Sequence, residues 1–566
     1  MIETNLVELF AKSFKENWDK EAVEDYISQK RLTYGEYAAE IELLHITFRE
    51  LGLQPGDVIA VCGKNSTAWS LAYMAALTYG IVIVPILDEF HPKDISHIVN
   101  HSEAMLFFCD SDIWRKMQFR DFEKLLGVVS LNDGLVIESK ESVELSKVRE
   151  NSKKLFADSY PEGFKPSNVN YIPRDKNALA ELCYTSGTTS HTKGVMLSYN
   201  NLCGNVVFGR TNYEAKGITL KSTLCILPLA HTYGVAFNLL MQLEWGAKIT
   251  FLGKIPSPNI ILEACAKVKP TLLFLVPLVL EKIYKNKIAP ILKKPVVAKL
   301  ISLPVIGPIV YRVIGRKVYN LLGGSALNEV VIGGAAINAE VEEFFYKAKF
   351  PFLVGYGMTE CAPLISYIRY EDFVPTSVGK ALSGIMEVRI CKENEEDETG
   401  EIQTRGENVM LGYYKEPEIT AATFTEDNWL KTGDLGEIDS EGNIYIRGRS
   451  KTMLLGSSGE NIYPEPIESM LQNMPFIQDC LILQRNKRLE AWVYPDYESM
   501  EKMAIPVEKL DEIMDDNRKT ANSSLAKFES LAVIRISKEP FPKTPKRTIK
   551  RMDTIKMIEE SLLNEK

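Results

Sequence analysis

The sequence predicts an α/β protein in which a large multi-layer N-terminal region with mixed or parallel sheets and a small β-rich subdomain precedes a small, mobile α+β C-terminal domain. Three observations support this prediction. A chain of 566 residues with 45% apolar content requires several packed domains. Short apolar runs alternate with helical patterns in the first part of the chain. From about residue 385, hairpin-like segments replace that alternation.

The N-terminal alternation indicates parallel βαβ layers. Buried strands appear as short apolar runs, and the connections between parallel strands are usually helices. The helix-like segment STAWSLAYMAALTY, at 66–79, lies between the first two such runs. The strand-like runs are 58–63, 81–86, 104–109, 223–230, 271–277, 329–334 and 350–357.

A helix is expected after the run at 329. Asn338 suits its N-cap, and Glu340 falls in the first turn, where the helix dipole favours an acidic side chain. Apolar residues then follow the spacing i, i+3, i+4, i+7 of one helix face. They are Val341, Phe344, Phe345 and Ala348.

The C-terminal part has a different texture. The strand-like segments MEVRIC and EIQTRG flank the acidic run KENEEDETGE, which we interpret as a solvated turn. Beyond them lie NIYIRGR, CLILQRNKRLEAWVYP, a charged helical stretch near 498–521, and SLAVIRIS. We therefore predict two domains, residues 1–447 and residues 448–566.

The composition limits the cellular environment and the classes of binding partner that we expect for this protein. A net charge of −9 argues against nucleic acid as a partner, although a local basic patch could still hold a phosphate. The nine cysteines are scattered without a CxxC pair, which favours a reduced, cytoplasmic protein. No secretory signal is evident at the N-terminus. The apolar stretch between Lys299 and Arg312 is shorter than the roughly 20 residues of a membrane span.

The most informative segment is YTSGTTSHTKG, at 184–194. Small residues let main-chain N–H groups approach phosphate oxygens, while hydroxyls and a lysine add donors and positive charge. The spacing differs from that of a GxxxxGK[ST] loop, so the segment alone is also compatible with a polar turn. The candidate phosphate-binding residues are Thr185, Ser186, Gly187, Thr188, Thr189 and Lys193.

This segment does not stand alone. Together with LPLAHTYG, GGAA, GYGMTE, RGENVMLGYYKEPEITAATF, WLKTGDLG and GRSKTMLLGSSGENIYPEPIE, it resembles the adenylate-forming superfamily, most of all the long-chain fatty acid CoA ligases. The resemblance implies that ATP and a fatty acid form an acyl-adenylate and pyrophosphate, and that coenzyme A then displaces AMP. Mg²⁺ and cationic donors would offset the repulsion between a carboxylate and ATP.

The resemblance also implies roles for individual residues. Thr359 would bond the α-phosphate and Glu360 would help to hold Mg²⁺. Asp434 would bond the ribose hydroxyls, and Arg449 would reach ribose or phosphate. Gly333, Ala335 and Tyr356 would surround the adenine, and Gly357 is a further candidate cofactor-binding residue.

Other residues receive more specific expectations. His231 would lie beside the acyl pocket, positioning the carboxylate or orienting a neighbouring ring such as that of Tyr233. Lys451 occupies the hinge position of the family, about which the small domain would rotate for the second half-reaction. Gly459 would belong to the face used in thioester formation. Cys361 is interpreted as a packing residue, because the chemistry needs no covalent enzyme intermediate.

One departure from the family pattern concerns adenylation. The family usually carries a lysine in a segment like PKTxxGKIxR, whereas this chain reads PKTPKRTIKR and places Thr548 there. Two interpretations remain open: the protein binds nucleotide without efficient adenylation, or a neighbouring lysine substitutes. In an extended segment, side chains two apart share a face, so Lys546 or Lys550 could serve, with Lys546 slightly preferred.

Substrate length and acceptor are not readable from these residues, and an acyl carrier protein is an alternative acceptor to coenzyme A. The stretch 286–323 is apolar yet dotted with cations, so it could lie on an anionic membrane or pack on the large domain. We therefore expect a cytoplasmic ligase with a peripheral membrane contact as one open interpretation.

Overall fold

The structure is a computed structural model that describes residues 3–185, 192–455, 461–485, 488–544 and 549–564. Contacts divide the chain into two compact units. The first comprises residues 1–337, 343–388 and 404–430, and the second comprises 338–342, 389–403 and 431–566. The mixed α/β class predicted from the sequence is confirmed. The boundary at residues 447 and 448 stays a prediction.

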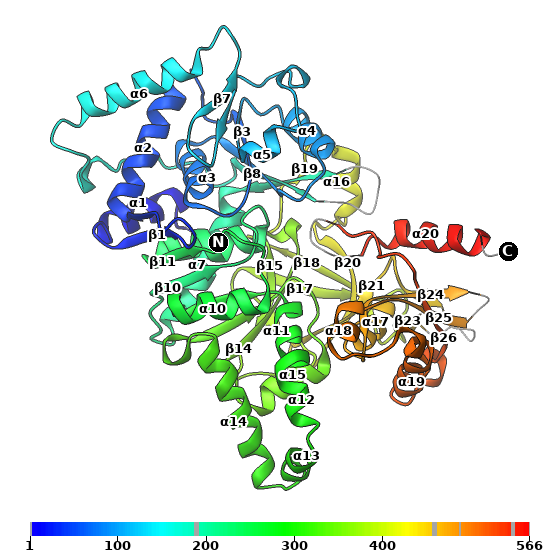
Figure 1. The fold of residues 1–566 in the computed structure, drawn as a ribbon. Helices are drawn as coiled ribbons and strands as arrows, with labels where there is room; N and C mark the ends of the chain where they lie inside the picture. The colour runs from blue at the N-terminus through cyan, green and yellow to red at the C-terminus, as the bar shows by residue number, and fades with distance from the viewer. Residues whose placement is uncertain (1–2, 186–191, 456–460, 486–487, 545–548, 565–566) are drawn as a thin grey trace. The chain divides into compact units, whose positions relative to one another are not determined.

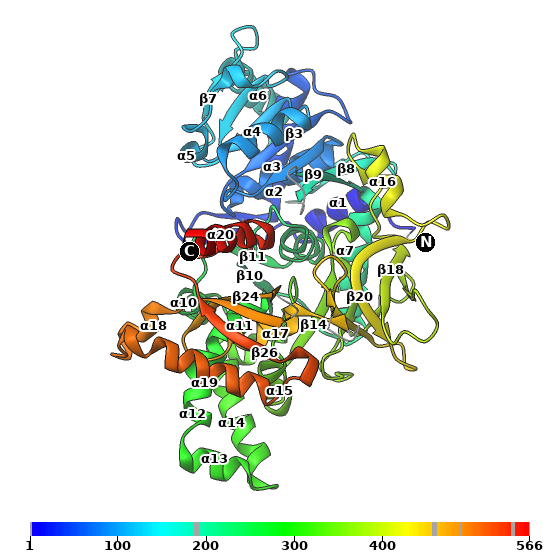
Figure 2. The ribbon, with the colours of Figure 1, turned by 90° about the vertical axis from the view of Figure 1, so that its right-hand side faces the viewer.

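The first unit contains two large sheets, whose strands form separate groups in Figures 1 and 2. In the described part of the chain, one sheet has nine strands and a parallel centre formed by β1, β11, β10, β12, β13 and β14. Its strands in spatial order are β16 (Lys380–Ala381), β15 (Leu364–Ile368), β14 (Phe352–Gly357), β13 (Glu329–Ile332), β12 (Leu272–Leu275), β10 (Ser222–Cys225), β11 (Lys248–Phe251), β1 (Glu21–Asp25) and β2 (Arg31–Thr33).

The other sheet has eight described strands and a parallel centre formed by β8, β4, β3, β5 and β6. Antiparallel strands close both of its ends. Its strands in spatial order are β19 (Gly412–Tyr413), β9 (Lys193–Ser198), β8 (Leu179–Thr185), β4 (Val82–Ile86), β3 (Val58–Cys62), β5 (Leu106–Cys109), β6 (Gly127–Ser130) and β7 (Val136–Ser139).

Every strand-like run predicted in the N-terminal region overlaps one of these strands. The segment 66–79 forms α3, which has a Ser66 cap at its start and ends at Gly80 in the left-handed conformation. Buried side chains cover nearly all of α3, as expected for a helix packed between layers. The helices of this unit are α1 (Leu6–Glu16), α2 (Tyr34–Glu50), α3 (Thr67–Tyr79), α4 (Pro92–His101), α5 (Ser111–Trp114), α6 (Leu145–Ser159), α7 (Tyr199–Glu214), α8 (Thr232–Gly234), α9 (Met241–Trp245), α10 (Pro258–Val268), α11 (Pro277–Ile283), α12 (Ala289–Leu292), α13 (Pro295–Ile301), α14 (Ile306–Leu321) and α16 (Pro417–Thr423).

The helix predicted after β13 is α15 (Ala339–Lys347), which spans the division between the units. Asn338 Oδ1 accepts a hydrogen bond from the main-chain N–H of Glu340 at 3.0 Å, which confirms the cap. All four predicted apolar residues of its face are buried.

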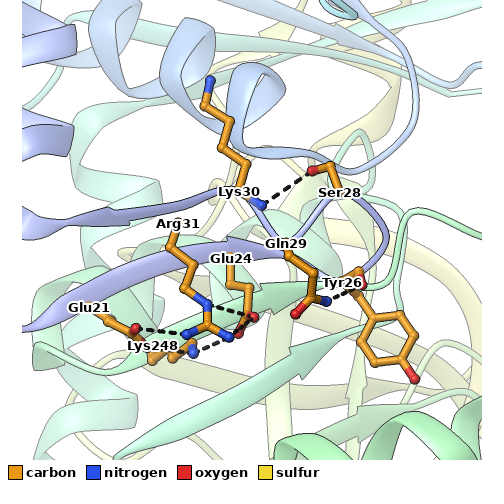
Figure 3. Close-up of polar contacts among 8 residues, drawn as sticks. All are labelled: Glu21, Glu24, Tyr26, Ser28, Gln29, Lys30, Arg31 and Lys248. Carbon is orange, nitrogen blue, oxygen red and sulfur yellow. Dashed lines mark hydrogen bonds and ion pairs between the residues drawn. The ribbon is translucent and has the colours of Figure 1, made fainter.

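Charged side chains form ion pairs near the β2 edge of the nine-stranded sheet. Arg31 Nη2 lies 2.8 Å from Glu24 Oε1, and Lys248 Nζ lies 2.6 Å from Glu24 Oε2 (Figure 3). Glu21 also pairs with Lys248, at 2.5 Å. These ion pairs tie β11, β1 and β2 together, and charged side chains discourage further pairing at a sheet edge.

The second unit holds the C-terminal α+β fold. In it, β24 pairs with β25 antiparallel and β25 with β26 parallel, over a core that includes Ile467, Ile482 and Met514. A four-stranded sheet of order β17-β18-β20-β21 also lies mostly in this unit. The elements are β17 (Met386–Cys391), β18 (Gly400–Gly406), β20 (Leu430–Ile438), β21 (Ile444–Arg449), β22 (Leu454–Leu455), β23 (Asn461–Ile462), α17 (Pro464–Gln472), β24 (Ile477–Arg485), β25 (Arg488–Pro495), α18 (Tyr497–Lys502), α19 (Leu510–Asn522), β26 (Leu531–Ile536) and α20 (Arg551–Asn564).

The sequence predicts one helical stretch near 498–521. The prediction was wrong in one respect, because the structure has two helices there, α18 and α19. Ala504 adopts a positive φ of 54°, which ends α18, and Pro506 precedes the short turn that leads into α19. A residue before proline is disfavoured in the helical region, so the break follows from the local sequence.

Candidate active site

The two described ends of the predicted phosphate loop meet. Thr185, the last residue of β8, pairs with Lys193, the first residue of β9, in an antiparallel register. The hydroxyl of Thr192 is buried and has no hydrogen-bond partner among the described residues. Four of the predicted residues, Ser186, Gly187, Thr188 and Thr189, lie outside the described residues and stay predictions.

Lys193 and Glu360 both contact one tyrosine, Tyr413. The ammonium of Lys193 is 5.1 Å from the centre of the Tyr413 ring, and the Tyr413 hydroxyl donates a 2.9 Å hydrogen bond to Glu360 Oε1. Burial and the neighbouring Glu360 charge raise the pKa of Tyr413, so its hydroxyl remains a donor. The structure thus brings together the cation after the loop and the predicted metal-binding carboxylate.

Strand pairing holds these three residues in place. Tyr413 in β19 pairs with Val195 in β9, and the main-chain N–H of Tyr414 donates to Gly194 O at 2.8 Å. Glu360 lies in a short 3₁₀ turn, Thr359–Cys361, between β14 and β15. Its carbonyl accepts from Met410 N–H at 2.9 Å. The turn and β19 are therefore fixed to each other through the main chain.

Two asparagines on α7 bind the loops that carry the cluster. Asn205 donates to Ala362 O at 2.8 Å and accepts from Leu364 N–H at 3.2 Å. Asn201, one helical turn earlier, donates to Glu407 O and Val409 O. Because both side chains are buried and bond main-chain groups, they orient the segments on which Glu360 and Tyr413 lie.

An apolar cavity adjoins the same turn. It is bordered by residues 355–358 and 363–364, which flank the turn that carries Thr359 and Glu360. Gly357 permits this close approach, since a Cβ there would lie 2.0 Å from Pro363 O. Aromatic and aliphatic side chains form the wall, among them Phe208, Tyr213, Phe237, Met241, Phe274, Val331 and Tyr367. The cavity suits a hydrocarbon group whose polar end faces the turn.

His231 lines this cavity, and its predicted place beside an acyl pocket stays a prediction. Its Nδ1 accepts a 3.2 Å hydrogen bond from the main-chain N–H of Tyr233 and caps α8. The hydroxyl of Tyr233 donates to Val331 O at 3.1 Å. The described hydrogen bond therefore joins the imidazole of His231 to the main chain of Tyr233, not to the Tyr233 ring. A role of His231 toward the carboxylate stays a prediction.

The residues expected around adenine, and the cofactor-binding candidate Gly357 beside them, are only partly brought together. Gly333, Tyr356 and Gly357 border the cavity, with Tyr356 buried at the end of β14. Gly333 lies against the Tyr233 ring, where a Cβ would be 3.3 Å from Cζ. Ala335 is exposed in the segment after β13 and does not line the cavity.

Asp434 and Arg449 pair with each other in the second unit. They face one another in the register of β20 and β21, and Arg449 Nε lies 3.1 Å from Asp434 Oδ1. Asp434 is buried while Arg449 is exposed, so the arginine partly neutralises a carboxylate that has little water around it. Their roles toward ribose and phosphate stay predictions. Lys451 is exposed in the turn after β21, and Gly459 lies outside the described residues.

The basic C-terminal segment is described only in part. Lys546 and Thr548 lie outside the described residues, while Lys550 is exposed, with its Nζ 3.9 Å from Asp553 Oδ2. Lys543 and Ile549 form an antiparallel bridge, and Lys550 N–H donates to Pro542 O at 2.8 Å. The extended segment expected around Lys546 and Thr548 falls on residues 545–548, which lie outside the described residues, so that expectation stays a prediction.

Cys361 has the properties of a packing residue. It is completely buried, and burial together with the nearby Glu360 charge raises the pKa of its thiol well above the usual range. A thiolate nucleophile is disfavoured in such surroundings.

Sequence reasoning assigned no role to Tyr413, Asn201 or Asn205. Tyr413 lies in the block RGENVMLGYYKEPEITAATF, and the two asparagines follow shortly after the loop segment. Their proximity to these motifs is the feature of the sequence that could have identified them. What they bond depends on contacts between segments about 50 to 200 positions apart, such as 413 with 360 and 201 with 407.

Within the first unit, a lysine, a carboxylate and an apolar cavity thus adjoin one turn, an arrangement chemically suited to an anionic group joined to an apolar one. The family model described as "AMP-binding enzyme" matches residues 10–414, and the model "AMP-binding enzyme C-terminal domain" matches 451–563. The chain belongs to the AMP-binding enzyme family.

Known proteins with similar sequences or folds agree with this assignment. The chain is 28% identical over 488 residues to the long-chain-fatty-acid–CoA ligase FadD15 of Mycobacterium bovis, covering 81% of this chain and 77% of that protein. It is 27% identical over 540 residues to fatty acyl-CoA synthetase A of Dictyostelium discoideum, covering 87% and 78%. The crystal structure of anthranilate CoA ligase AuaEII with anthranoyl-AMP superposes with a TM-score of 0.78 at 18% identity, covering 99% and 98% of the two chains. That last likeness shows the fold.

Proposed function

We propose that the protein is an ATP- and Mg²⁺-dependent, AMP-forming acid–thiol ligase that activates a fatty acid as its acyl-adenylate and transfers the acyl group to coenzyme A. The observation that carries this proposal is the continuity of the apolar cavity with the turn that presents Glu360 to Tyr413 and Lys193. An acyl chain in the cavity would direct its carboxylate toward the residues suited to phosphate and metal.

The described residues fit a magnesium nucleotide. Lys193 supplies a cation, and the buried hydroxyl of Thr192 has no hydrogen-bond partner among the residues that the structure describes. Among the described residues, no group of three or more His, Cys, Asp or Glu could hold a metal ion. Glu360 would therefore hold Mg²⁺ together with nucleotide phosphates and water, the usual arrangement for this ion. When bound, Mg²⁺ would neutralise phosphate charge that otherwise repels the carboxylate.

The chemistry of the cavity favours a fatty acid as substrate. Its wall is formed largely by phenylalanine, tyrosine, methionine and valine side chains, so a hydrocarbon would lose water on entering it without leaving polar groups unpaired. The names of the two sequence relatives support the same class. The fold of anthranilate CoA ligase does not favour an aromatic acid for this chain, because that resemblance concerns architecture.

Coenzyme A is the proposed acceptor because both sequence relatives are named as CoA ligases or synthetases. We further propose residues 1–447 and 448–566 as the functional domains, with Lys451 as the hinge about which the smaller one turns between the half-reactions. Neither a carrier-protein acceptor nor a non-catalytic binder gains support from these two relatives.

The test is AMP release by the purified protein with ATP, Mg²⁺ and single acids, with and without coenzyme A. Saturated medium- and long-chain acids are compared with anthranilate. We expect AMP formation to require coenzyme A and a fatty acid. Turnover with anthranilate alone would overturn the substrate class, and AMP release that needs an acyl carrier protein would overturn the acceptor.

A substitution links the activity to this site. Glu360→Gln should reduce AMP formation by about 100-fold or more, since one preorganised electrostatic group contributes roughly that factor. The matched control is Glu418→Gln, an exposed glutamate on α16 close in sequence to Tyr413. Equal activity of the wild type and Glu360→Gln would contradict the assigned role of Glu360.

A further inference from the structure

A helical projection of the first unit has no role in the proposed chemistry. Helices α12, α13 and α14 extend from the rest of that unit, with α13 at the far end in both views (Figures 1 and 2). One face of α14 is packed: Ile314 and Val318 are buried, and Gly315 lies so close to Ala348 that a Cβ would be 2.6 Å from its side chain. The sequence left open whether the stretch 286–323 packs on the large domain or lies on a membrane. In the structure, only one face of α14 is packed.

The other face exposes aliphatic side chains to water. Val305 is 77% exposed and Val296 is 72% exposed, far above the buried level normal for valine. Ile309 and Val313 follow at helical spacing and are each 54% exposed. We call the exposed aliphatic set the apolar tip: Val296, Leu303, Val305, Ile306, Ile309 and Val313. A concentrated apolar surface of this kind usually marks an interaction site.

Exposed cations lie among and beside the residues of the apolar tip in the sequence. The six are Lys293, Lys294, Lys299, Arg312, Arg316 and Lys317. From residue 286 to 328 the sequence contains no aspartate or glutamate, although the whole chain has a net charge of −9. No salt bridge between described residues includes any of these six cations. The positive charge of the six side chains is therefore not neutralised by a described carboxylate. Arg312 and Arg316 lie three positions after Ile309 and Val313, respectively, which places charge directly beside the apolar stripe.

We propose that this projection docks on the surface of an anionic lipid bilayer. Aliphatic side chains flanked by lysine and arginine match such a surface, because the former enter the headgroup boundary while the latter attract anionic headgroups. A second copy of the chain is disfavoured as the occupant, since it would bring two sets of six uncompensated cations together. The described helices include none long and apolar enough to cross a membrane, so the contact is peripheral.

The benefit of docking rests on the proposed function, while the docking itself does not. Fatty acids partition into bilayers, so a ligase held at that surface would meet its substrate at a raised local concentration. Binding is measured without ATP, acid or coenzyme A. Failure of the docking proposal is therefore separable from failure of the ligase proposal.

The experiment is co-sedimentation of the full chain with vesicles of phosphatidylglycerol and phosphatidylcholine, or of phosphatidylcholine alone. We expect binding to the anionic vesicles only, falling by about tenfold or more when salt rises from about 0.05 M to about 0.5 M. The variant K293Q/K294Q/K299Q and the variant V305S/I306S should each lose at least about tenfold in partition coefficient.

Matched controls exclude a general effect of charge or surface polarity. K116Q/K153Q/K154Q removes three exposed lysines elsewhere, and L135S/I172S removes two exposed aliphatic side chains elsewhere. Both should bind as the wild type does. Three outcomes would overturn the proposal. Two are unchanged binding of the tip variants and equal binding of the wild type to neutral vesicles. The third is a stable wild-type dimer that V305S/I306S abolishes, without any binding to vesicles.

Discussion

Tyr413 donates its hydroxyl hydrogen bond to Glu360 at 2.9 Å across two segments about 50 residues apart in the chain. The same ring lies beside the Lys193 ammonium, so one tyrosine contacts both a cation and a carboxylate, and no direct ion pair between those two charges is described. This arrangement keeps both charges available for a ligand, since a direct lysine–glutamate pair would satisfy each of them internally.

Replacing Tyr413 by phenylalanine tests that positioning. The Tyr413→Phe variant keeps the ring beside Lys193 but leaves Glu360 without its described donor. We expect kcat/KM for AMP formation to fall roughly 10- to 100-fold, because a hydrogen bond to a charged group contributes about 1.5–3 kcal/mol. A merely structural role would leave the dependence on Mg²⁺ unchanged, whereas a misplaced Glu360 should raise the Mg²⁺ concentration needed for half-maximal rate.

Tyr414→Phe is the control, because Tyr414 is the adjacent residue and no hydrogen bond of its hydroxyl is described. If Tyr413→Phe and Tyr414→Phe behave alike in rate and in Mg²⁺ dependence, the positioning role is wrong.

The lysine missing from the usual adenylation position gives a second prediction. Lys546→Ala or Lys550→Ala should abolish ATP:pyrophosphate exchange while leaving thioester formation from preformed acyl-adenylate intact. Only the adenylation step requires a cation between the carboxylate and the α-phosphate. Lys543→Ala is the control, since Lys543 already pairs with Asp479 at 2.8 Å. Normal exchange in the Lys546/Lys550 double variant would eliminate substitution by a neighbouring lysine.

The sequence was sufficient for seven strands in the parallel centres of the two large sheets and for α15, because buried parallel strands are apolar runs and α15 carries its own cap and apolar face. It could not show that Asn205 bonds the turn after Glu360, since that contact joins residues 157 positions apart. It also could not show that Lys543 pairs with Ile549, because a run of cations and prolines has no hydrophobic period to indicate register.

A buried carboxylate outside the site predicts how stability depends on pH. Burial raises the pKa of Glu181 to about 7, although the Tyr73 hydroxyl donates a hydrogen bond to it and partly offsets the effect. The folded chain therefore holds this proton more tightly than the unfolded chain. Glu181 consequently costs stability as pH rises from about 4.5 to about 7, by roughly 3 kcal/mol when fully ionised.

Glu181→Gln removes that charge at every pH. We expect the variant to melt at a higher temperature than the wild type at pH 8, with little difference at pH 5, where Glu181 is protonated in the folded state. Glu123→Gln, at an exposed glutamate, should show no such difference between the two pH values. Equal melting temperatures of Glu181→Gln and wild type at pH 8 would show that Glu181 is not a destabilising buried charge.

The cavity wall predicts where acyl specificity can be changed. Phe208 on α7 is half-buried and packs edge-on against Tyr367, with ring centres 5.3 Å apart, so its removal enlarges the cavity at moderate cost to the core. In Phe208→Ala, the ratio of kcat/KM for a long acid to that for a medium acid should rise by about tenfold or more, because each additional buried methylene contributes about 0.8 kcal/mol. Phe156→Ala removes a half-buried ring from α6, outside the cavity, and should leave the ratio unchanged. A ratio that stays constant in Phe208→Ala while overall activity falls would mean that Phe208 supports the fold without contacting the acyl chain.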